Sequence, residues 1–371
     1  TRDMRAGATP EFISKVVVLL NTTWRDGSHE ERRKSFTLKE AETLAGQLNH
    51  ISNSCMWLKH LMSHVYTSMA AAMKQNLAFL TCTNKHFRAQ IKQAKLAVVD
   101  EKSRLEATFA QAETSRRVHN LKKKYFINET LREELNIIRR ALESEQVLKA
   151  TPLAHLIDND PDSEADGDLS LDAAGGWSTS MQLWWYIEWP EHIKQRTLRF
   201  VKDGKSGTLI DINALEYATL IIGYAASTYY WVIEDNRSKL GIPYPRSLIR
   251  ADNKVAGFWA VKGCKRSFVG RSLGRLQSAM MINNPVGLDN SFVDTKTNVI
   301  ADRISRFKSE ANSQREFELL TQEYPQLRCC RRFRPSQELI SLILDALLLG
   351  KLVDPLEASR VVQSNPGKVT S

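Results

Sequence analysis

The chain has 371 residues, 42% of them hydrophobic, and a formal net charge of +10 with an isoelectric point near 9.3. This length suits two or three domains with real hydrophobic cores. Because no apolar run reaches the roughly 18 residues that a membrane span needs, membrane insertion is not expected. The excess of Lys and Arg favours a polyanionic partner, since phosphate neutralisation supplies most of the sequence-independent affinity for nucleic acid.

Cysteine usage indicates an intracellular setting, in the cytoplasm or the nucleus. The five cysteines show no metal-ligand spacing, and an adjacent pair rarely forms a bridge, which favours reduced thiols. They are Cys55, Cys82, Cys264, Cys329 and Cys330.

The first predicted elements are two helices within residues 37–69. Thr37 and Glu40 have the spacing of a capping box that opens an apolar stripe, and this helix is expected to end near Asn53. A second apolar stripe runs from Trp57 to Met69, so the two helices are predicted to pack as a hairpin.

Residues 85–150 contain neither glycine nor proline and are rich in charged residues and Ala. Apolar spacing predicts a helix from Ile127 to Leu142 and, more loosely, from Phe87 to Ala112. A basic run would either follow a nucleic-acid backbone or be the solvated charge of an exposed helix. The run comprises Arg116, Arg117, Lys122, Lys123 and Lys124.

The next segment, Asn159–Asp168, is acidic and turn-rich, so it is predicted to be a surface linker. Leu169, Leu171 and Ala173 then alternate with polar residues, which predicts a half-buried strand with Asp172 at its end. The aromatic residues that follow are predicted to be core rather than stacking platforms. They are Trp177, Trp184, Trp185, Tyr186 and Trp189.

Apolar residues from Ile212 to Ala226 follow helical spacing, and Glu216 stands among them, where a charge is unfavourable without a cation or a proton. The run Ser247–Ala251 predicts a short strand, followed by a helix that Asp252 or Asn253 opens. A polar and basic group beginning at Asn253 is predicted to hold a nucleic-acid backbone. Its members are Asn253, Lys254, Lys262, Lys265, Arg266, Arg271 and Arg275.

Asp302 lies in the first turns of a predicted helix with apolar positions Val299, Ile300 and Ile304. Further on, Ser336 is predicted to cap a helix that ends at Gly350, and residues from 363 onward are predicted to be disordered.

Four acids therefore stand in four different local patterns: Asp172, Glu216, Asp252 and Asp302. Hydrolysis of nucleic acid by two metal ions needs three or four carboxylates, because two Mg²⁺ must lie close together and hold the attacking and leaving oxygens. Each acid also has a simpler explanation. An Asp at a strand end commonly forms a turn, and Asp252 and Asp302 are both placed to favour a helix N-terminus.

The surroundings of these acids carry a family resemblance. In order they are D-A-A-G-G-W from Asp172, a glutamate on an apolar helix at Glu216, A-D-N-K around Asp252, and N-V-I-A-D-R-I-S-R around Asp302. This series resembles the ribonuclease H domain attached to retroelement reverse transcriptases, with the DIRS-like, tyrosine-recombinase type nearest. The pattern of residues 37–50, T-L-K-E followed by L-A-G-Q-L-N-H, is similar to the thumb of the same polymerases.

The resemblance implies an α/β (α+β) fold: a mixed five-stranded sheet with flanking helices, preceded by an all-helical region. Its expected segments are the end of the palm and the thumb (1–80), a helical connection (81–158), a ribonuclease H-like domain (159–310) and a helical tail (311–371). Fingers and palm of the polyprotein would precede residue 1. Since no Y-x-D-D motif occurs, no polymerase activity is expected from these residues.

The resemblance also implies endonucleolytic hydrolysis of the RNA strand of RNA–DNA hybrids, by water activated between two Mg²⁺, with Mn²⁺ as an alternative ion. Asp172 would bridge both ions, Glu216 and Asp252 would complete one site, and Asp302 would hold the other. Two features depart from the family. Its loop histidine before the last helix is missing, since all eight histidines precede residue 193, and its usual loop glycine is replaced by Val293–Thr297.

Two other classes of protein remain open at this level. One is a nucleic-acid-binding remnant of a retroelement whose chemistry has lapsed, favoured by the missing histidine and palm. The other is a helical scaffold in which the acids are incidental. A catalytically active nuclease requires the four carboxylates to converge on one solvent-accessible site, whereas in a scaffold they would be scattered.

Overall fold

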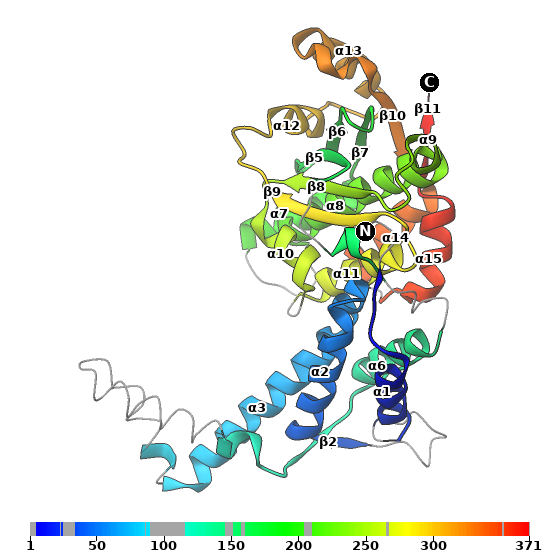
Figure 1. Cartoon of the computed structure of the whole chain (residues 1–371). Coiled ribbons are helices and arrows are strands. Elements are labelled where there is room, and N and C mark those ends of the chain that lie inside the picture. The colour runs from blue at the N-terminus through cyan, green and yellow to red at the C-terminus, as the bar shows by residue number, and fades with distance from the viewer. Residues whose placement is uncertain are drawn as a thin grey trace, which may run out of the picture. The chain divides into compact units, whose positions relative to one another are not determined.

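The computed structural model describes residues 5–22, 24, 34–85, 87–89, 116–144, 151–156, 160–203, 210–264, 267–350 and 352–370 (Figure 1). The chain forms two compact units. The helical unit comprises Thr9–Ile51 and Met62–Glu143, and the sheet unit comprises Thr1–Ala8, Ser52–Leu61 and Ser144–Ser371. The predicted connection therefore shares its compact unit with most of the predicted thumb, and the predicted tail shares one with residues 163–310.

The helical unit contains helices and a small two-stranded antiparallel sheet, whose strands are far apart in the sequence. The helices are α1 (Pro10–Thr22), α2 (Leu38–Ser52), α3 (Ser63–Thr83) and α6 (Glu129–Glu143), and the antiparallel strands are β2 (Ser35–Thr37) and β3 (Lys124–Phe126). Helix α6 packs against α1 and α3. Its buried Glu134 accepts hydrogen bonds from the Ser63 hydroxyl and from the backbone N–H groups of His64 and Val65, so it satisfies the first turn of α3.

The capping box at the start of α2 is confirmed. The Thr37 N–H donates to Glu40 Oε2 at 2.8 Å, and the Glu40 N–H donates to Thr37 Oγ1 at 3.3 Å. The second predicted helix is interrupted, because η1 (Met56–Leu61) is a 3-10 helix of the sheet unit and α3 begins only at Ser63. The predicted helix over 127–142 corresponds to α6. Most of the loosely predicted helix over 87–112 lies outside the described residues.

A seven-stranded mixed sheet organises the sheet unit, in the order β11-β10-β7-β6-β5-β8-β9. Strand β6 lies between β5 and β7 and is antiparallel to both, whereas β8 and β9 continue parallel to β5, and β10 lies parallel to β7. The strands are β5 (Ser163–Leu169), β6 (Ala173–Ser178), β7 (Leu183–Glu188), β8 (Arg246–Ala251), β9 (Gly287–Phe292), β10 (Arg331–Pro335) and β11 (Gly367–Thr370). A separate pair joins β1 (Arg5–Ala6) to β4 (Thr151–Pro152).

Helices cover both faces of this sheet (Figure 1). On one face a large core joins the sheet to α8, α11, α14 and α15, and on the other a smaller core joins it to α12 and α13. The helices are α7 (Glu191–Asp203), α8 (Ile212–Thr228), α9 (Asn236–Leu240), α10 (Lys254–Lys262), α11 (Phe268–Met281), α12 (Val299–Ser305), α13 (Ser313–Glu323), α14 (Gln337–Leu349) and α15 (Pro355–Ser364). Short segments η2 (Leu153–His155), η3 (Tyr229–Ile233) and η4 (Pro325–Cys329) complete the unit.

Two glycines let the layers approach closely at β6. A Cβ on Gly175 would lie 2.4 Å from the backbone nitrogen of Ser305, so the absence of a side chain allows α12 to rest directly on the strand. A Cβ on Gly176 would meet the Trp185 ring at 2.2 Å on the other face. The glycine pair of the D-A-A-G-G-W motif is therefore a packing requirement of both layers.

Three expectations from the sequence are corrected. The sheet has seven strands rather than five, because β10 and β11 from the predicted tail extend it beyond β7. Residues 163–168 belong to the interior strand β5 rather than to a surface linker. Of the predicted strand 169–173, Leu169 ends β5, Ala173 begins β6, and residues 170–172 form the turn between them. The residues from 363 onward, predicted to be disordered, include the end of α15 and β11.

Other local predictions are confirmed. Trp184, Trp185, Tyr186 and Trp189 are buried in the cores. The Ser336 hydroxyl caps α14 by accepting from the Leu339 N–H, and α14 ends at Gly350 in a left-handed conformation. Within the described residues, no helix combines the length and apolar composition needed to cross a membrane.

Candidate functional site

Parallel pairing of β5 and β8 brings two carboxylates to the same end of the sheet. Asp166 pairs with Arg250, so the register continues to Asp168 opposite Asp252, which directly follows β8. Parallel neighbours in register point to the same face. The two acids therefore lie side by side at the carboxyl ends of adjacent strands.

Two further acids come from helices on opposite faces of the sheet. Glu216 lies in the first turns of α8, which packs on β5 and β8, and Asp302 lies on α12, which packs on β5 and β6. Two glycines show which helix lies on which face of the sheet. A Cβ on Gly167 of β5 would meet Thr219 of α8, and a Cβ on Gly175 of β6 would meet Ser305 of α12.

The charges of the four acids act on one another. Burial is the largest cause that raises the pKa of Asp168, to about 6, and the negative charges of Asp252 and Asp302 raise it further. Burial likewise raises the pKa of Glu216 well above its usual value, with added repulsion from Asp168 and Asp252. We call Asp168, Glu216, Asp252 and Asp302 the acidic cluster.

The hydrogen bonds to Asp168 come from neutral donors, and the positive charge of Arg306 also lowers its pKa. Ser305 Oγ lies 2.9 Å from Asp168 Oδ2, and this hydrogen bond lowers the pKa of Asp168 against the burial effect. The Asn298 side-chain amide donates to the Gly167 carbonyl at 3.1 Å and lies 3.4 Å from Asp168 Oδ1. These contacts fix the carboxylate between β5 and α12.

Glu216 is the least satisfied member of the acidic cluster. Its side chain is only 6% exposed, and Oε2 has no hydrogen-bond partner among the described residues. A buried carboxylate oxygen without a partner is unfavourable unless a proton or a cation reaches it. The sequence-based expectation for Glu216 therefore matches its surroundings.

The two remaining members carry partners at their outer edge. Asp252 Oδ2 accepts from Thr295 Oγ1 at 2.7 Å, and Asp302 Oδ1 accepts from Arg306 Nε and Nη2 at 2.9 and 2.7 Å. The Asp302–Arg306 pair is solvent-accessible, since the Arg306 side chain is 64% exposed. Thr295 comes from the segment Val293–Thr297, between β9 and α12.

Asp172 does not lie with the other predicted acids. It occupies the turn between β5 and β6, its side chain is 70% exposed, and Lys194 Nζ lies 3.4 Å from its Oδ1. The turn follows the end of β5, whereas Asp168 sits within the strand and faces Asp252. The position predicted for Asp172 is thus filled by Asp168.

A signal for Asp168 was present in the sequence. Ala165, Gly167 and Leu169 alternate with Asp166 and Asp168, which is the period of a strand. The acidic composition of the segment masked this alternation, because acids are rare on buried strands. Asn298, Ser305 and Arg306 lie in the N-V-I-A-D-R-I-S-R motif, but their contacts with the carboxylates depend on how α12 meets the sheet.

The oxygen donors suit a hard divalent cation, although their spacing is not that of a closed metal site. Within the described part of the chain, no three His, Cys, Asp or Glu side chains are grouped closely enough to hold a metal ion. Mutual repulsion among four carboxylates and the unpartnered Glu216 oxygen are nevertheless the conditions that a cation relieves. The residues present therefore fit Mg²⁺ by their chemistry.

The predicted backbone-binding residues have different environments. Lys254 and Lys262 are exposed on α10, and Lys254 Nζ lies 4.5 Å from the centroid of the Phe292 ring. Arg271 is half-buried over the Phe268 ring, and Arg275 is 1% exposed, which removes it from any duplex surface. Lys265 and Arg266 lie outside the described residues.

Asn253 has a structural role in the same region. Its side-chain oxygen accepts from the N–H groups of Val255 and Ala256 and caps α10, while its amide donates to Asn213 at 3.0 Å. Since Asn253 follows Asp252 directly, this cap fixes the backbone that carries one acid of the cluster.

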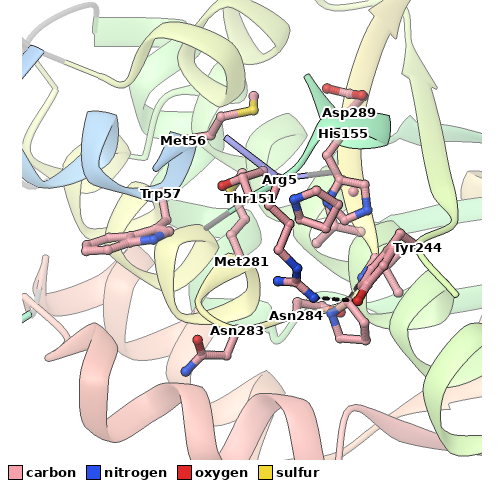
Figure 2. Close-up of a pocket in the computed structure, with 15 residues that line it drawn as sticks. Arg5, Met56, Trp57, Thr151, His155, Tyr244, Met281, Asn283, Asn284 and Asp289 are labelled. Carbon is pink, nitrogen blue, oxygen red and sulfur yellow. Dashed lines mark hydrogen bonds between the residues drawn. The ribbon is translucent and has the colours of Figure 1, made fainter. Parts of the chain in front are cut away.

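A cavity of about 200 Å³ lies at the opposite end of β8 and β9 (Figure 2). In it Arg5 donates a hydrogen bond to the Tyr244 hydroxyl, and burial lowers the pKa of His155 to about 4. Its acid, Asp289, is paired with Arg246 at 2.8 Å. Strand length separates this cavity from the acidic cluster by about 20 Å, so it belongs to no shared site.

Comparison of the chain with protein-family models, with curated proteins and with solved structures found no match. The geometry of the acidic cluster therefore carries the functional argument.

Proposed function

We propose that the sheet unit is a ribonuclease H-like nuclease that cleaves the RNA strand of RNA–DNA hybrids, as part of an intracellular retrotransposon reverse transcriptase polyprotein whose fingers and palm lie elsewhere. The carrying observation is that Asp168, Glu216, Asp252 and Asp302 reach one end of the sheet from four parts of the chain. Asp252 and Asp302 raise the pKa of Asp168, and Asp168 and Asp252 raise that of Glu216. Five strands, β7-β6-β5-β8-β9, with flanking helices suit the mixed sheet that the sequence resemblance implied.

The ligand set that we propose replaces Asp172 by Asp168. Asp168 stands centrally, because Asp252 and Asp302 both act on it and Glu216 responds to its charge. When bound, two Mg²⁺ would supply charge neutralisation and an activated water for phosphodiester hydrolysis. Ser305 and Asn298 would hold Asp168 in place, and the cap by Asn253 would hold Asp252.

Part of the basic surface would bind the substrate. Lys254 and Lys262 project from α10 directly after Asp252, and exposed ammonium groups neutralise phosphates without reading sequence. Binding by these residues should weaken steeply as salt rises. Arg275 has no part in this surface because it is buried.

The alternative function is hybrid binding without cleavage. It is favoured by the two-point contact of Arg306 with Asp302, which leaves one ligand already neutralised, and by the missing loop histidine. In that case the fold would bind nucleic acid through its basic residues and the acidic cluster would be a remnant.

The test is cleavage of an end-labelled RNA–DNA hybrid by the full chain with Mg²⁺, beside Asp168→Asn and the matched control Asp172→Asn. We expect Asp168→Asn to lower the cleavage rate about 100-fold or more, while Asp172→Asn keeps most activity. Equal rates for wild type and Asp168→Asn would refute the proposal.

Thermal unfolding with Mg²⁺ gives a readout that does not depend on turnover. Mg²⁺ should raise the Tm of the wild type and leave that of Asp168→Asn nearly unchanged, because a ligand that binds only the folded state stabilises it. Binding of the hybrid with neither cleavage nor stabilisation by Mg²⁺ would establish the alternative function instead.

A further inference from the structure

The C-terminal helices α14 and α15 form an apolar groove that the proposed nuclease does not use. The cavity has a volume of about 720 Å³. Residues of α14 and of α15 line it, together with Leu352, Val353 and Asp354 from between the two helices. The apolar lining consists of Leu342, Leu352, Val353, Ala358 and Val361.

The groove remains open although α14 is firmly packed. Leu339, Ile343 and Leu347 point into the large core, so the residues that line the groove occupy the outer face of the same helix. On α15, Val362 is buried in that core, whereas Val361 is 39% exposed at the groove. The apolar lining of the cavity therefore comes from Leu342 on α14, from Ala358 and Val361 on α15, and from Leu352 and Val353 between them.

The rim of the groove is acidic in a chain with a net charge of +10. The charged side chains among its described lining residues are all acidic: Glu338, Asp345, Asp354 and Glu357. Asp354 also caps α15, since its Oδ1 accepts from the Leu356 N–H at 3.0 Å. Glu338 and Glu357 are exposed.

We propose that this groove is a docking site for a basic amphipathic helix of a partner protein. An apolar groove between two helices can bind the apolar face of a third helix. The bound helix contributes side chains at positions i, i+3 or i+4, and i+7. Lys or Arg on either side of that apolar face would meet Glu338 and Glu357, the exposed carboxylates of the rim. The same carboxylates repel phosphate, so the groove disfavours nucleic acid and anionic membranes.

Charge placement separates this surface from the candidate nuclease site. The exposed lysines of α10 suit a polyanion, whereas the groove suits a polycation. A chain with both surfaces would hold nucleic acid with one and a basic protein segment with the other. The inference does not rest on hydrolysis and stands if the acidic cluster proves inactive.

The probe is a fluorescently labelled synthetic helix with Leu at i, i+3, i+4 and i+7 and Lys at the flanking positions, titrated with the full chain. A peptide of the same composition in permuted order is the peptide control. We expect the amphipathic peptide to bind at least about tenfold more tightly than the permuted one, because only the former gathers its Leu side chains on one face.

Charge reversal at the exposed rim tests the assigned surface. Glu338→Lys/Glu357→Lys should weaken peptide binding about tenfold or more. The matched control, Glu191→Lys/Glu318→Lys, makes the same change in net charge at exposed sites on α7 and α13 and should leave binding unchanged. Val361→Gln removes an exposed apolar contact without reaching the core and should also weaken binding.

Equal affinity of the wild type and Glu338→Lys/Glu357→Lys for the amphipathic peptide would overturn the proposal, as would equal affinity for the permuted peptide. Vesicles containing phosphatidylserine are the competing occupant. If the wild type bound such vesicles in a manner abolished by Val361→Gln while ignoring the peptide, the groove would be a membrane contact and the assignment would fail.

Discussion

Two buried acids of strand β5 differ in the groups that compensate their charge. Asp166 and Asp168 are two residues apart and face the same side, and both are less than 10% exposed. Asp166 is joined to Arg250, whose Nε and Nη2 lie 2.6 and 3.1 Å from its two oxygens. Asp168 accepts hydrogen bonds from Ser305 and Asn298, and the negative charges of Asp252 and Asp302 act on it together with the more weakly acting positive charge of Arg306.

Asp166 therefore stabilises the fold through its ion pair, whereas Asp168 is a candidate for a functional role. A carboxylate with a two-point guanidinium contact is satisfied within the chain. A carboxylate among other carboxylates destabilises the folded state at neutral pH unless something outside the chain compensates it. Perturbed pairs of this kind gather at functional sites.

The largest expected effect comes from breaking the satisfied pair. Arg250→Met keeps most of the side-chain volume but leaves Asp166 buried without its cation, so the free energy of unfolding should fall by about 2 kcal/mol, less than for a fully enclosed pair. Urea unfolding monitored by Trp fluorescence measures the change.

A matched control is Arg334→Met, which removes an Arg whose partner Glu310 is also exposed. It should change the stability of the sheet unit far less. If Arg250→Met and Arg334→Met were equally harmless, Asp166 would not depend on its partner and the contrast within β5 would be lost.

Replacing Asp168 should raise the free energy of unfolding, whereas replacing the partner of Asp166 should lower it. Because burial raises the folded-state pKa of Asp168 from 3.8 to about 6, the folded state binds this proton more tightly than the unfolded state does. The contribution of Asp168 to stability is therefore fully present below about pH 4 and is lost as pH rises through about 6. In EDTA, Asp168→Asn should be more stable than wild type above pH 6, by about 2 kcal/mol.

The difference between Asp168→Asn and wild type should vanish toward pH 4. Urea unfolding at a series of pH values checks this, with Asp172→Asn as the control because its side chain is exposed in the turn. A variant that is destabilised at pH 8, or a difference independent of pH, would show that Asp168 carries no electrostatic penalty.

The smallest expected effect is that of removing Ser305, a neutral hydrogen-bond donor to Asp168. Ser305→Ala removes a hydrogen bond to Asp168 that lowers its pKa, so the pH-dependent loss of stability should move to higher pH and about 1 kcal/mol should be lost near neutrality. Ser359→Ala, which loses only a bond to the Leu356 carbonyl on α15, controls for the loss of a hydroxyl. An unchanged pH profile for Ser305→Ala would assign Ser305 to packing alone.

Local signals in the sequence predicted much of the fold. The capping box at Thr37, the helix carrying Glu216 and the strand before Asp252 follow from spacing and short-range hydrogen bonds, and the structure has them within a residue or two. The sequence also predicted three of the four acids of the cluster. These are the parts that neighbouring residues decide.

The misplaced parts depend on pairing between distant segments. Asp168 belongs to the cluster because β5 pairs with β8 in one register, and Asp166 is tolerated because Arg250 lies opposite. Neither fact is visible in the acidic run that contains them. Likewise, β10 and β11 became strands only because the edge of β7 was available.

That added edge has a consequence for any shortened version of the protein. Strand β10 hydrogen-bonds to β7, and β11 covers β10, so the outermost strand is a short one carrying Gly367 and Lys368. Ending the chain before residue 331 would uncover the backbone donors and acceptors of β7, a strand rich in tryptophan. Exposed apolar edges recruit further strands, so such a truncation should self-associate and precipitate even with every residue of the acidic cluster in place.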